Sequence, residues 1–285
     1  IDKDVARELL KLDNTLWVNG LTSIDKEVAQ ELAKCKGSLS LYGLNSIDKD
    51  VAMELVKCEG NLSFNNKLTS IDKDVAQELA KCKGGLFLDS LTSIDKEVAQ
   101  ELARHEGHLF IDDREQLAEE MRETIPDLHL SGLRSIDKDV AQELVKYEGW
   151  LSLSGLTSID KDVARELARF KSRKLDFRQL TSIDKDVAKE LAKFNGSGLF
   201  LNGLTSINKD VAQELAKFKG SLSLYGLTSI DKDVAMELAK FKGGQLFLNG
   251  LTSINKEVAQ ELANHKGRLH LCELTSVEKD VVHEL

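Results

Sequence analysis

A unit of 23 or 24 residues recurs along this chain, and this repeat limits the possible folds more than any other feature. Its clearest part is a short run of Ser, Ile, Asp or Asn, and Lys. The isoleucine of this run falls at positions 1, 24, 47, 71, 94, 136, 159, 183, 207, 230 and 254, and Val277 takes the same place. One step of 42 residues, after Ile94, breaks the spacing. Self-similarity at such a period is typical of solenoids, in which each unit packs against its neighbours.

Each unit combines a strand pattern with a helix pattern. Leu39 and Leu41 alternate with Ser40 and Tyr42, as in a strand that is buried on one face. Residues 47–58 then place apolar side chains at helical spacing. We therefore predict one strand and one helix in every unit.

The ends of the predicted helices carry recognisable residues. Asp48 stands where a helix N-cap belongs, and other units place Asn208, Asn255 or Glu278 there. Gly60 follows the last helical residues, where a left-handed backbone is often needed. We predict a side-chain cap at the start of each helix and a left-handed glycine after its end.

One strand and one helix cannot bury their apolar sides alone, so the units must stack, with successive strands parallel through right-handed crossovers. Strands stack about 4.8 Å apart and helices about 8–10 Å apart, which bends the stack with its strands on the concave side. The unit L-x-L-x-G-L-x-x-I, followed by V-A-x-E-L-A-K, resembles the repeat of bacterial leucine-rich-repeat proteins over nearly the whole chain. The resemblance implies an α/β solenoid of horseshoe shape, with a parallel β-sheet on the concave face and α-helices on the convex face. It does not imply the asparagine ladder of that family, because Leu44 and its equivalents stand where the family places Asn.

We predict a single repeat solenoid over residues 1–285, with an irregular, shorter repeat at about 109–128. There, Leu109–Ile111 and Leu128–Leu130 are predicted as neighbouring strands. Two interpretations of this segment stay open. It is either a diverged repeat that still packs, or a kink or acidic docking surface, since seven acids stand between Asp112 and Asp127.

Charge and composition disfavour several function classes. A net charge of −9 argues against a nucleic-acid partner, because phosphates attract a basic surface. The sequence has no apolar run near the roughly 20 residues of a membrane span. It shows no spacing typical of a catalytic triad, a phosphate-binding loop or a dinucleotide site. A motif present in every unit is architecture, so we expect no catalysis, no cofactor and no metal.

The cysteines and histidines fall into two settings. The same helix-end position carries Phe or Tyr in some units and, in others, Cys35, Cys58, Cys82, His105 or His265. A position shared by Cys and Phe is a core position, which predicts buried free thiols there. Cys272, His129 and His270 instead lie in outward strand positions, and Cys272 is expected to be exposed. Unpaired buried thiols weakly favour a cytoplasmic location, and secretion stays open.

Outward strand positions vary between units, whereas the inward leucines barely change. The first outward column runs Trp17, Ser40, Ser63, Phe87, Phe110, His129, Ser152, Asp176, Phe200, Ser223, Phe247 and His270. The second runs Asn19, Tyr42, Asn65, Asp89, Asp112, Ser131, Ser154, Arg178, Asn202, Tyr225, Asn249 and Cys272. Aromatics mixed with Asn, Asp, Ser and Tyr are typical of protein interfaces.

We therefore predict that the concave face binds a protein or peptide ligand. The predicted contact residues are Trp17, Tyr42, Phe87, Asp89, Phe110, Asp112, His129, Asp176, Arg178, Phe200, Tyr225, Phe247 and His270. Asp89 and Asp112 are expected to be stacked neighbours in a solvated acidic patch, with a calcium site as the less favoured interpretation. Because Leu224 points inward and Ser223 outward, Leu224→Ala is expected to cost about 2–5 kcal/mol and Ser223→Ala almost nothing.

Two alternatives stay open. The outward aromatics can simply stack along the sheet and cover it. The chain can also be a structural spacer or surface-assembly component that associates through its ends or its convex face, including with copies of itself. Ile1, Val5 and Leu9 form the apolar stripe of the first helix, and Val277, Val281 and Leu285 that of the last. Neither end shows a recognisable cap, so we expect that the array continues or that other chains cover its ends.

Overall fold

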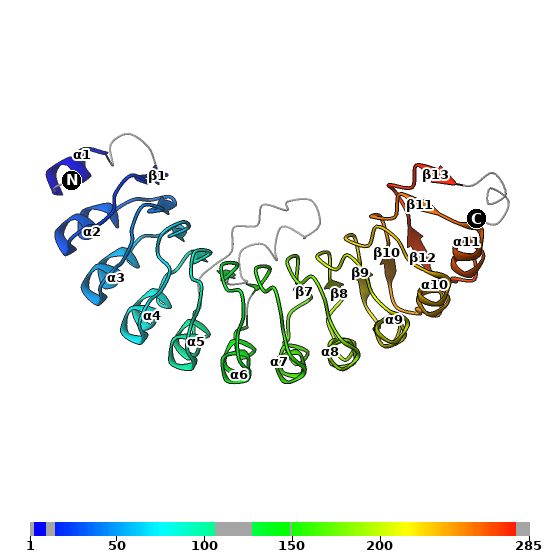
Figure 1. Cartoon of the computed structure of the whole chain (residues 1–285). Coiled ribbons are helices and arrows are strands. Elements are labelled where there is room, and N and C mark those ends of the chain that lie inside the picture. Colours follow the sequence, from blue (N-terminus) through cyan, green and yellow to red (C-terminus); the bar gives the residue numbers. More distant parts are fainter. Residues whose placement is uncertain (1–2, 10–14, 106–126, 149, 278–285) are drawn as a thin grey trace. The chain divides into compact units, whose positions relative to one another are not determined.

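A computed structural model of the chain describes residues 3–9, 15–105, 127–148 and 150–277 (Figure 1). The chain divides into two compact parts, each made of several repeats. We call them unit 1 (residues 1–153) and unit 2 (residues 154–285), and from here on a single 23- or 24-residue element is called a repeat. The elements of unit 1 are α1 (Lys3–Leu9), β1 (Leu16–Trp17), α2 (Lys26–Leu32), β2 (Leu39–Ser40), α3 (Lys49–Leu55), β3 (Leu62–Ser63), α4 (Lys73–Leu79), β4 (Leu86–Phe87), α5 (Lys96–Leu102), β5 (Asp127–His129), α6 (Lys138–Leu144) and β6 (Trp150–Ser152). Those of unit 2 are α7 (Lys161–Leu167), β7 (Lys174–Asp176), α8 (Lys185–Leu191), β8 (Gly198–Phe200), α9 (Lys209–Leu215), β9 (Ser221–Ser223), α10 (Lys232–Leu238), β10 (Gln245–Phe247), β11 (Ser253–Ile254), α11 (Lys256–Leu262), β12 (Arg268–His270) and β13 (Ser276–Val277).

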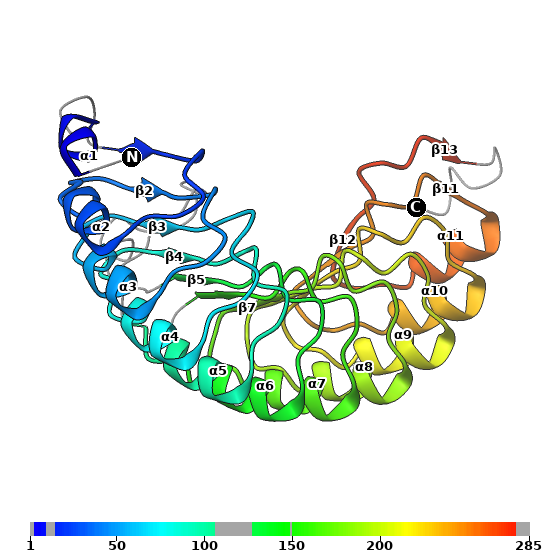
Figure 2. The ribbon, with the colours of Figure 1, turned by 60° about the vertical axis from the view of Figure 1, so that its left-hand side comes forward.

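Each unit has a layer of parallel strands and a layer of helices. Unit 1 carries a six-stranded sheet in the order β1-β2-β3-β4-β5-β6, and unit 2 a five-stranded sheet in the order β12-β10-β9-β8-β7. Figure 2 shows β2 to β5 side by side, with α2 to α6 as a separate row. Inward leucines pair with inward leucines across the strands, as Leu39 does with Leu62. The predicted solenoid of strand and helix repeats with a parallel sheet is confirmed, and a single domain over 1–285 stays a prediction.

The helices begin as the sequence predicts. Asp48 adopts an extended backbone, and its Oδ1 accepts a hydrogen bond from the Val51 N–H at 2.8 Å. This bond satisfies one of the N–H groups that the first helical turn leaves unpaired. The same cap is made by Asp25, Asp72, Asp95, Asp137, Asp160, Asp184, Asn208, Asp231 and Asn255. Glu278, predicted for the same role, lies outside the described residues.

The glycine after each helix serves close packing and not a left-handed turn, so the prediction for Gly60 is wrong. No glycine among the described residues has a positive φ. A Cβ placed on Gly60 would overlap the backbone carbonyl of Gly37 in the preceding repeat. Neighbouring turns thus approach backbone to backbone, which a residue without a side chain permits.

The core lies between the two layers of each unit. Leu39, Leu41 and Leu55 are fully buried there, together with their equivalents in other repeats. The helix-end position is buried at Cys35, Cys58 and Cys82 and also where Phe or Tyr replaces the thiol, as predicted. In unit 2 its rings stack on one another, with 6.3 Å between the centroids of Phe194 and Phe218. This position therefore builds a continuous seam along the helix ends.

A row of buried carboxylates, which the sequence analysis treated only as architecture, runs along the helices. Glu54 is 4% exposed, and it forms an ion pair with Lys57. Glu78 pairs with Lys81 in the same way at 2.6 Å. A desolvated carboxylate needs such a partner to stay charged. Every helix from α2 to α10 repeats the buried glutamate.

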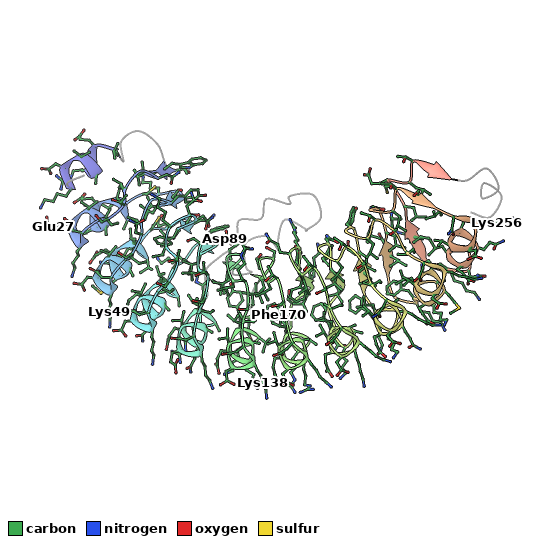
Figure 3. The ribbon with its side chains drawn as sticks, viewed as in Figure 1. Glu27, Lys49, Asp89, Lys138, Phe170 and Lys256 are labelled. Atoms are coloured by element: carbon green, nitrogen blue, oxygen red, sulfur yellow. The ribbon has the colours of Figure 1, made fainter. Side chains whose placement is uncertain are left out.

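A second row of ion pairs joins the exposed starts of neighbouring helices. Lys49 lies 3.6 Å from Asp74 in the next repeat, and Lys185 lies 3.6 Å from Asp210. In Figure 3, Lys49 and Lys138 lie on the helix side of unit 1, whereas Asp89 lies on the opposite side with the strands. Exposed pairs of this kind contribute little stability individually. Their main consequence is that positive and negative charges alternate along the helix side.

The two described strands that flank the predicted irregular repeat in the sequence are neighbours in the sheet. β4 pairs directly with β5, with Leu86 opposite Leu128 and Phe87 opposite His129. Helix α5 likewise packs against α6. Residues 106–126, which include the predicted strand Leu109–Ile111, lie outside the described residues. The predicted pairing of a 109–111 strand with the strand at 128–130 is therefore wrong for the sheet, because β4 occupies that side of β5.

Candidate functional site

The outward side chains of the strands form the candidate site, which we call the strand face of each unit. Three large apolar residues of the described chain are markedly exposed, namely Trp17 at 73%, Tyr225 at 45% and Val5 at 44%. Trp17 on β1 and Tyr225, two residues after β9, belong to strand faces, while Val5 lies on α1. Each strand face therefore presents one aromatic side chain that the protein itself leaves uncovered.

Two serines of the first column are less accessible than the sequence predicts. Ser40 is 7% exposed and Ser223 only 1% exposed. Ser223 lies between Phe200 and Phe247 on the two neighbouring strands, and the larger rings cover it. The expectation that Ser223 faces solvent is therefore wrong: alternation placed it on the correct side of the sheet, but its neighbours bury it.

The second column forms a ladder of its own, at a different position from the asparagine ladder of leucine-rich-repeat proteins. Asn202 Oδ1 accepts from the Ser223 hydroxyl at 2.6 Å and from the Tyr225 N–H at 3.4 Å. Asn19 makes the same two bonds in unit 1, to Ser40 and Tyr42. The amide side chains thereby tie each strand end to the next one. Their side-chain oxygens are thus already engaged within the protein.

This ladder also includes the predicted contact residue Asp89. Its Oδ1 accepts from the Ser131 N–H at 3.1 Å, and its own N–H donates to Asn65 Oδ1 at 3.1 Å. Asp112, predicted as its stacked neighbour, lies outside the described residues, as does Phe110. Among the described residues, no group of three or more His, Cys, Asp or Glu side chains is placed to hold a metal ion. Asp89 thus has a structural role in the sheet.

Aromatic side chains of the strand face stack across neighbouring strands. In unit 2 the Phe247 ring lies 6.3 Å from the Tyr225 ring and 4.4 Å from the His270 ring, both within 19° of parallel. In unit 1 the Phe87 ring lies 4.2 Å from that of His129. These stacks agree with the alternative that aromatics cover the sheet, and each pair contributes up to about 1 kcal/mol. Phe87, His129, Phe247 and His270 nevertheless remain partly exposed.

Trp17 and Phe87, both predicted contact residues, are not neighbours along the first column of unit 1. Trp17 stands opposite Ser40, and Phe87 stands opposite Ser63. The two serine strands β2 and β3 therefore separate the tryptophan from the phenylalanine. Tyr42 is half-buried and lies beside Asn19.

Charged residues gather on the first strand of unit 2. The Arg178 Nε donates to Asp176 Oδ2 at 2.8 Å, and Lys174 places its Nζ 5.5 Å from the centre of the Phe200 ring. Burial raises the pKa of the Asp176 carboxyl, and the Arg178 guanidinium opposes this effect. The Arg178 side chain is largely exposed. Sequence analysis missed Lys174, although the unusual turn of Lys171 to Lys174 marks it.

The thiols lie as predicted. Cys58 Sγ is directed at the Gly37 carbonyl at 3.3 Å, and all four cysteines are free. Cys272 is exposed, and its N–H donates to Asn249 Oδ1. Within the described chain, the helices are too short and too polar to traverse a bilayer.

Comparison with known proteins identifies similar structures but no sequence family. No protein-family model matches the chain, and neither does any curated protein. An internalin from Listeria monocytogenes is 17% identical, with 95% of this chain and 88% of that chain covered and a TM-score of 0.42. A leucine-rich-repeat protein from Leptospira interrogans is 18% identical, with 98% of this chain and 88% of that chain covered and a TM-score of 0.42. A chain of the Drosophila Toll–Spatzle complex is 13% identical, with 91% of this chain and 34% of that chain covered and a TM-score of 0.55. The chain has the leucine-rich-repeat fold: its repeats show it, and the similarity to the Toll–Spatzle chain agrees.

Proposed function

We propose that the chain is a non-catalytic scaffold whose strand faces bind a protein or peptide. The observation that carries the proposal is the exposure of Trp17 and Tyr225 on the strand faces. Both lie on a surface whose polar neighbours are already hydrogen-bonded within the protein. An exposed aromatic on a rigid, internally satisfied surface loses little entropy when a partner covers it.

The fold is compatible with this function. A chain of similar fold occurs in the Drosophila Toll–Spatzle complex, which is an assembly of proteins. Fold alone does not determine function, so the proposal rests on the exposed side chains. The strand face is also where the repeats differ, while buried leucines and capping residues are copied. Differences between repeats give such a surface its specificity.

A capture experiment with matched variants tests the proposal. The intact chain is immobilised, proteins retained from an extract are identified, and the binding of the most enriched one is measured with purified components. Trp17→Ser and Tyr225→Ser are expected to weaken binding by about 1 kcal/mol or more each. Lys138→Glu on the helix side is the control and is expected to change it little.

Retention that survives both strand-face variants and is lost with the helix-side control would contradict the proposal. That result would instead favour a structural component that associates through its helix side.

A further inference from the structure

Two sets of cations at and beyond the helix ends of unit 2 have different surroundings. Those at the helix ends are neutralised, because Lys193 pairs with Glu190 at 2.7 Å and Lys217 with Glu214 at 2.6 Å. The second set lies beyond the helix ends, in or directly after the turns that lead from α7, α9, α10 and α11 to the next strand, whereas the turn after α8 has Asn195 at the equivalent place. These exposed residues, which we call the basic edge, are Lys171, Arg173, Lys219, Lys242, Lys266 and Arg268.

No acidic residue accompanies the basic edge. The helix-to-strand turns of unit 2, at 168–173, 192–197, 216–220, 239–244 and 263–267, contain no Asp or Glu. Within the described part of the chain, no residue of the basic edge forms an ion pair. The corresponding turns of unit 1 are mixed, with Glu59 and Glu148 as well as Lys36 and Lys83. The excess of positive charge is thus a property of unit 2.

Backbone hydrogen bonds hold these turns side by side. The Gly244 N–H donates to the Gly220 carbonyl at 2.9 Å, and the Gly198 N–H donates to the Arg173 carbonyl at 3.1 Å. The cations therefore form a row along the edge of the sheet, with a gap at the turn before β8. Over the four steps from β7 to β12, at about 4.8 Å per strand, the row spans roughly 19 Å.

The basic edge borders the aromatic part of the strand face. Lys174 begins β7 directly after Arg173, and its Nζ lies over the Phe200 ring. Phe247 and His270 are stacked on the two strands that follow Lys242 and Lys266. A ligand that lies along the row can therefore place charged groups on the edge and apolar groups on the rings.

We propose that the basic edge of unit 2 docks an acidic, partly apolar segment of a partner protein, an inference that rests on the proposed protein-binding function. A row of unpaired cations in a protein of net charge −9 attracts carboxylates and orients the partner that carries them. Glutamate or aspartate side chains pair with the lysines and arginines of the row. Leucine or aromatic side chains of the same segment contact Phe200 and Phe247.

The stacked rings favour an acidic protein segment over a nucleic acid. Single-stranded nucleic acids bind cationic grooves by stacking their bases on aromatic side chains. In unit 2 the two faces of Phe247 are directed at Tyr225 and His270, so this ring is already stacked within the protein. Ring edges contact aliphatic side chains well but offer no platform for a base.

Fluorescence anisotropy with the full chain tests this inference. The probe is a labelled peptide of about ten residues in which Glu alternates with Leu and Gly, long enough to span the row. The matched peptide with Gln in place of Glu reports the role of charge, and a single-stranded oligonucleotide is the second comparison. The combined substitution Lys219→Glu, Lys242→Glu and Lys266→Glu reverses the edge. Lys36→Glu with Lys83→Glu alters the same repeat position in unit 1, and circular dichroism checks that both variants fold.

The Glu peptide is expected to bind at least about tenfold more tightly than the Gln peptide, and more weakly as salt rises from about 50 to about 300 mM. The unit 2 variant is expected to lose about tenfold in affinity or more, and the unit 1 variant less than about twofold. Equal binding of the Glu and Gln peptides, equal losses in the two variants, or tighter binding of the oligonucleotide would each overturn the inference.

The two proposals fail in different ways. If the Glu peptide does not bind but Trp17→Ser still weakens partner capture, the acidic-segment inference is wrong and the protein-binding function stands. If the peptide binds the edge while Trp17→Ser and Tyr225→Ser leave the affinity for the captured partner unchanged, the strand-face function is wrong and docking at the edge stands.

Discussion

Ser223→Ala is the sharpest test of how the strand face is built. Ser223 is 1% exposed, and its hydroxyl donates to Asn202 Oδ1 at 2.6 Å. Loss of one buried hydrogen bond costs about 0.5–1.5 kcal/mol. Asn202 Oδ1 then keeps only the Tyr225 N–H, whose bond is long at 3.4 Å. We therefore expect a loss of about 1 kcal/mol in the free energy of unfolding, where alternation alone predicts almost none.

Urea unfolding followed by circular dichroism measures this difference against three matched variants. Ser40→Ala removes the same bond in unit 1, to Asn19 at 2.7 Å, and is expected to cost about as much. Ser63→Ala is the control, since its hydroxyl makes no hydrogen bond to the described residues, and should be nearly neutral. Leu224→Ala empties a fully buried core position and should cost about 2–5 kcal/mol.

A double-mutant cycle with Asn202→Ala decides whether the hydrogen bond carries the effect. If it does, the loss from Ser223→Ala falls markedly once Asn202 is alanine. Equal losses for Ser223→Ala and Ser63→Ala, or no coupling between Ser223 and Asn202, would refute the reasoning.

Three further predictions follow from the packing. Gly243→Ala places a Cβ against the Gly220 carbonyl and should destabilise the protein by about 1–3 kcal/mol. At Gly20 a Cβ would have no other atom within 4 Å, so Gly20→Ala should not change stability. Similar thermal melts for the two variants would contradict this prediction. Cys272 should react quickly with a thiol reagent, whereas Cys58 and Cys82 should react slowly, because burial raises their pKa values to about 11 and about 12. Mass spectrometry of the labelled native protein measures these rates, and modification of Cys58 as fast as Cys272 would disprove the prediction. Hydrogen bonds from Arg7 and Lys34 lower the pKa of Glu31 from 4.5 to about 2, so the stability that this carboxylate adds is present above pH 4.5 and is lost as the pH falls toward 2. Glu31→Gln should therefore lower the melting temperature at pH 6 and narrow the difference in melting temperature between pH 6 and pH 3. If Glu31→Gln changes this pH profile no more than the exposed control Glu148→Gln does, the prediction is wrong.

The features that sequence predicts well are those decided within one repeat. Asp48 caps its own helix three residues away, and Leu39 and Leu41 are buried by the layer that every repeat shares. The Cys and Phe exchange at the helix end likewise reports a position that is buried in each copy. Such local rules transfer from repeat to repeat, so twelve versions of the same pattern support one another.

The failures concern features that depend on neighbouring repeats. Ser223 is buried because Phe200 and Phe247 flank it, and this cannot be read from its own strand. Residues 109–111 have the alternating pattern of a strand, yet β4 pairs with β5, because the pattern of one strand does not determine which strands pair with each other. The sequence pattern predicts a left-handed backbone at Gly60, whereas the constraint on this residue is its close contact with the backbone carbonyl of Gly37 in the preceding repeat.

Net charge is a poor guide to the surface of a solenoid, and the basic edge illustrates why. Along the helix side, each buried glutamate has a lysine or arginine partner, as in Glu237 with Lys240 at 2.9 Å, so much of the charge cancels locally. At a distance of about a Debye length, a partner interacts with the net charge that remains on the side that it approaches. In unit 2 that remainder is positive along the helix-to-strand turns, in a chain whose formal charge is −9. The total charge therefore argues against a long polyanion that must cover many sides, but it does not argue against a short acidic segment that contacts one edge.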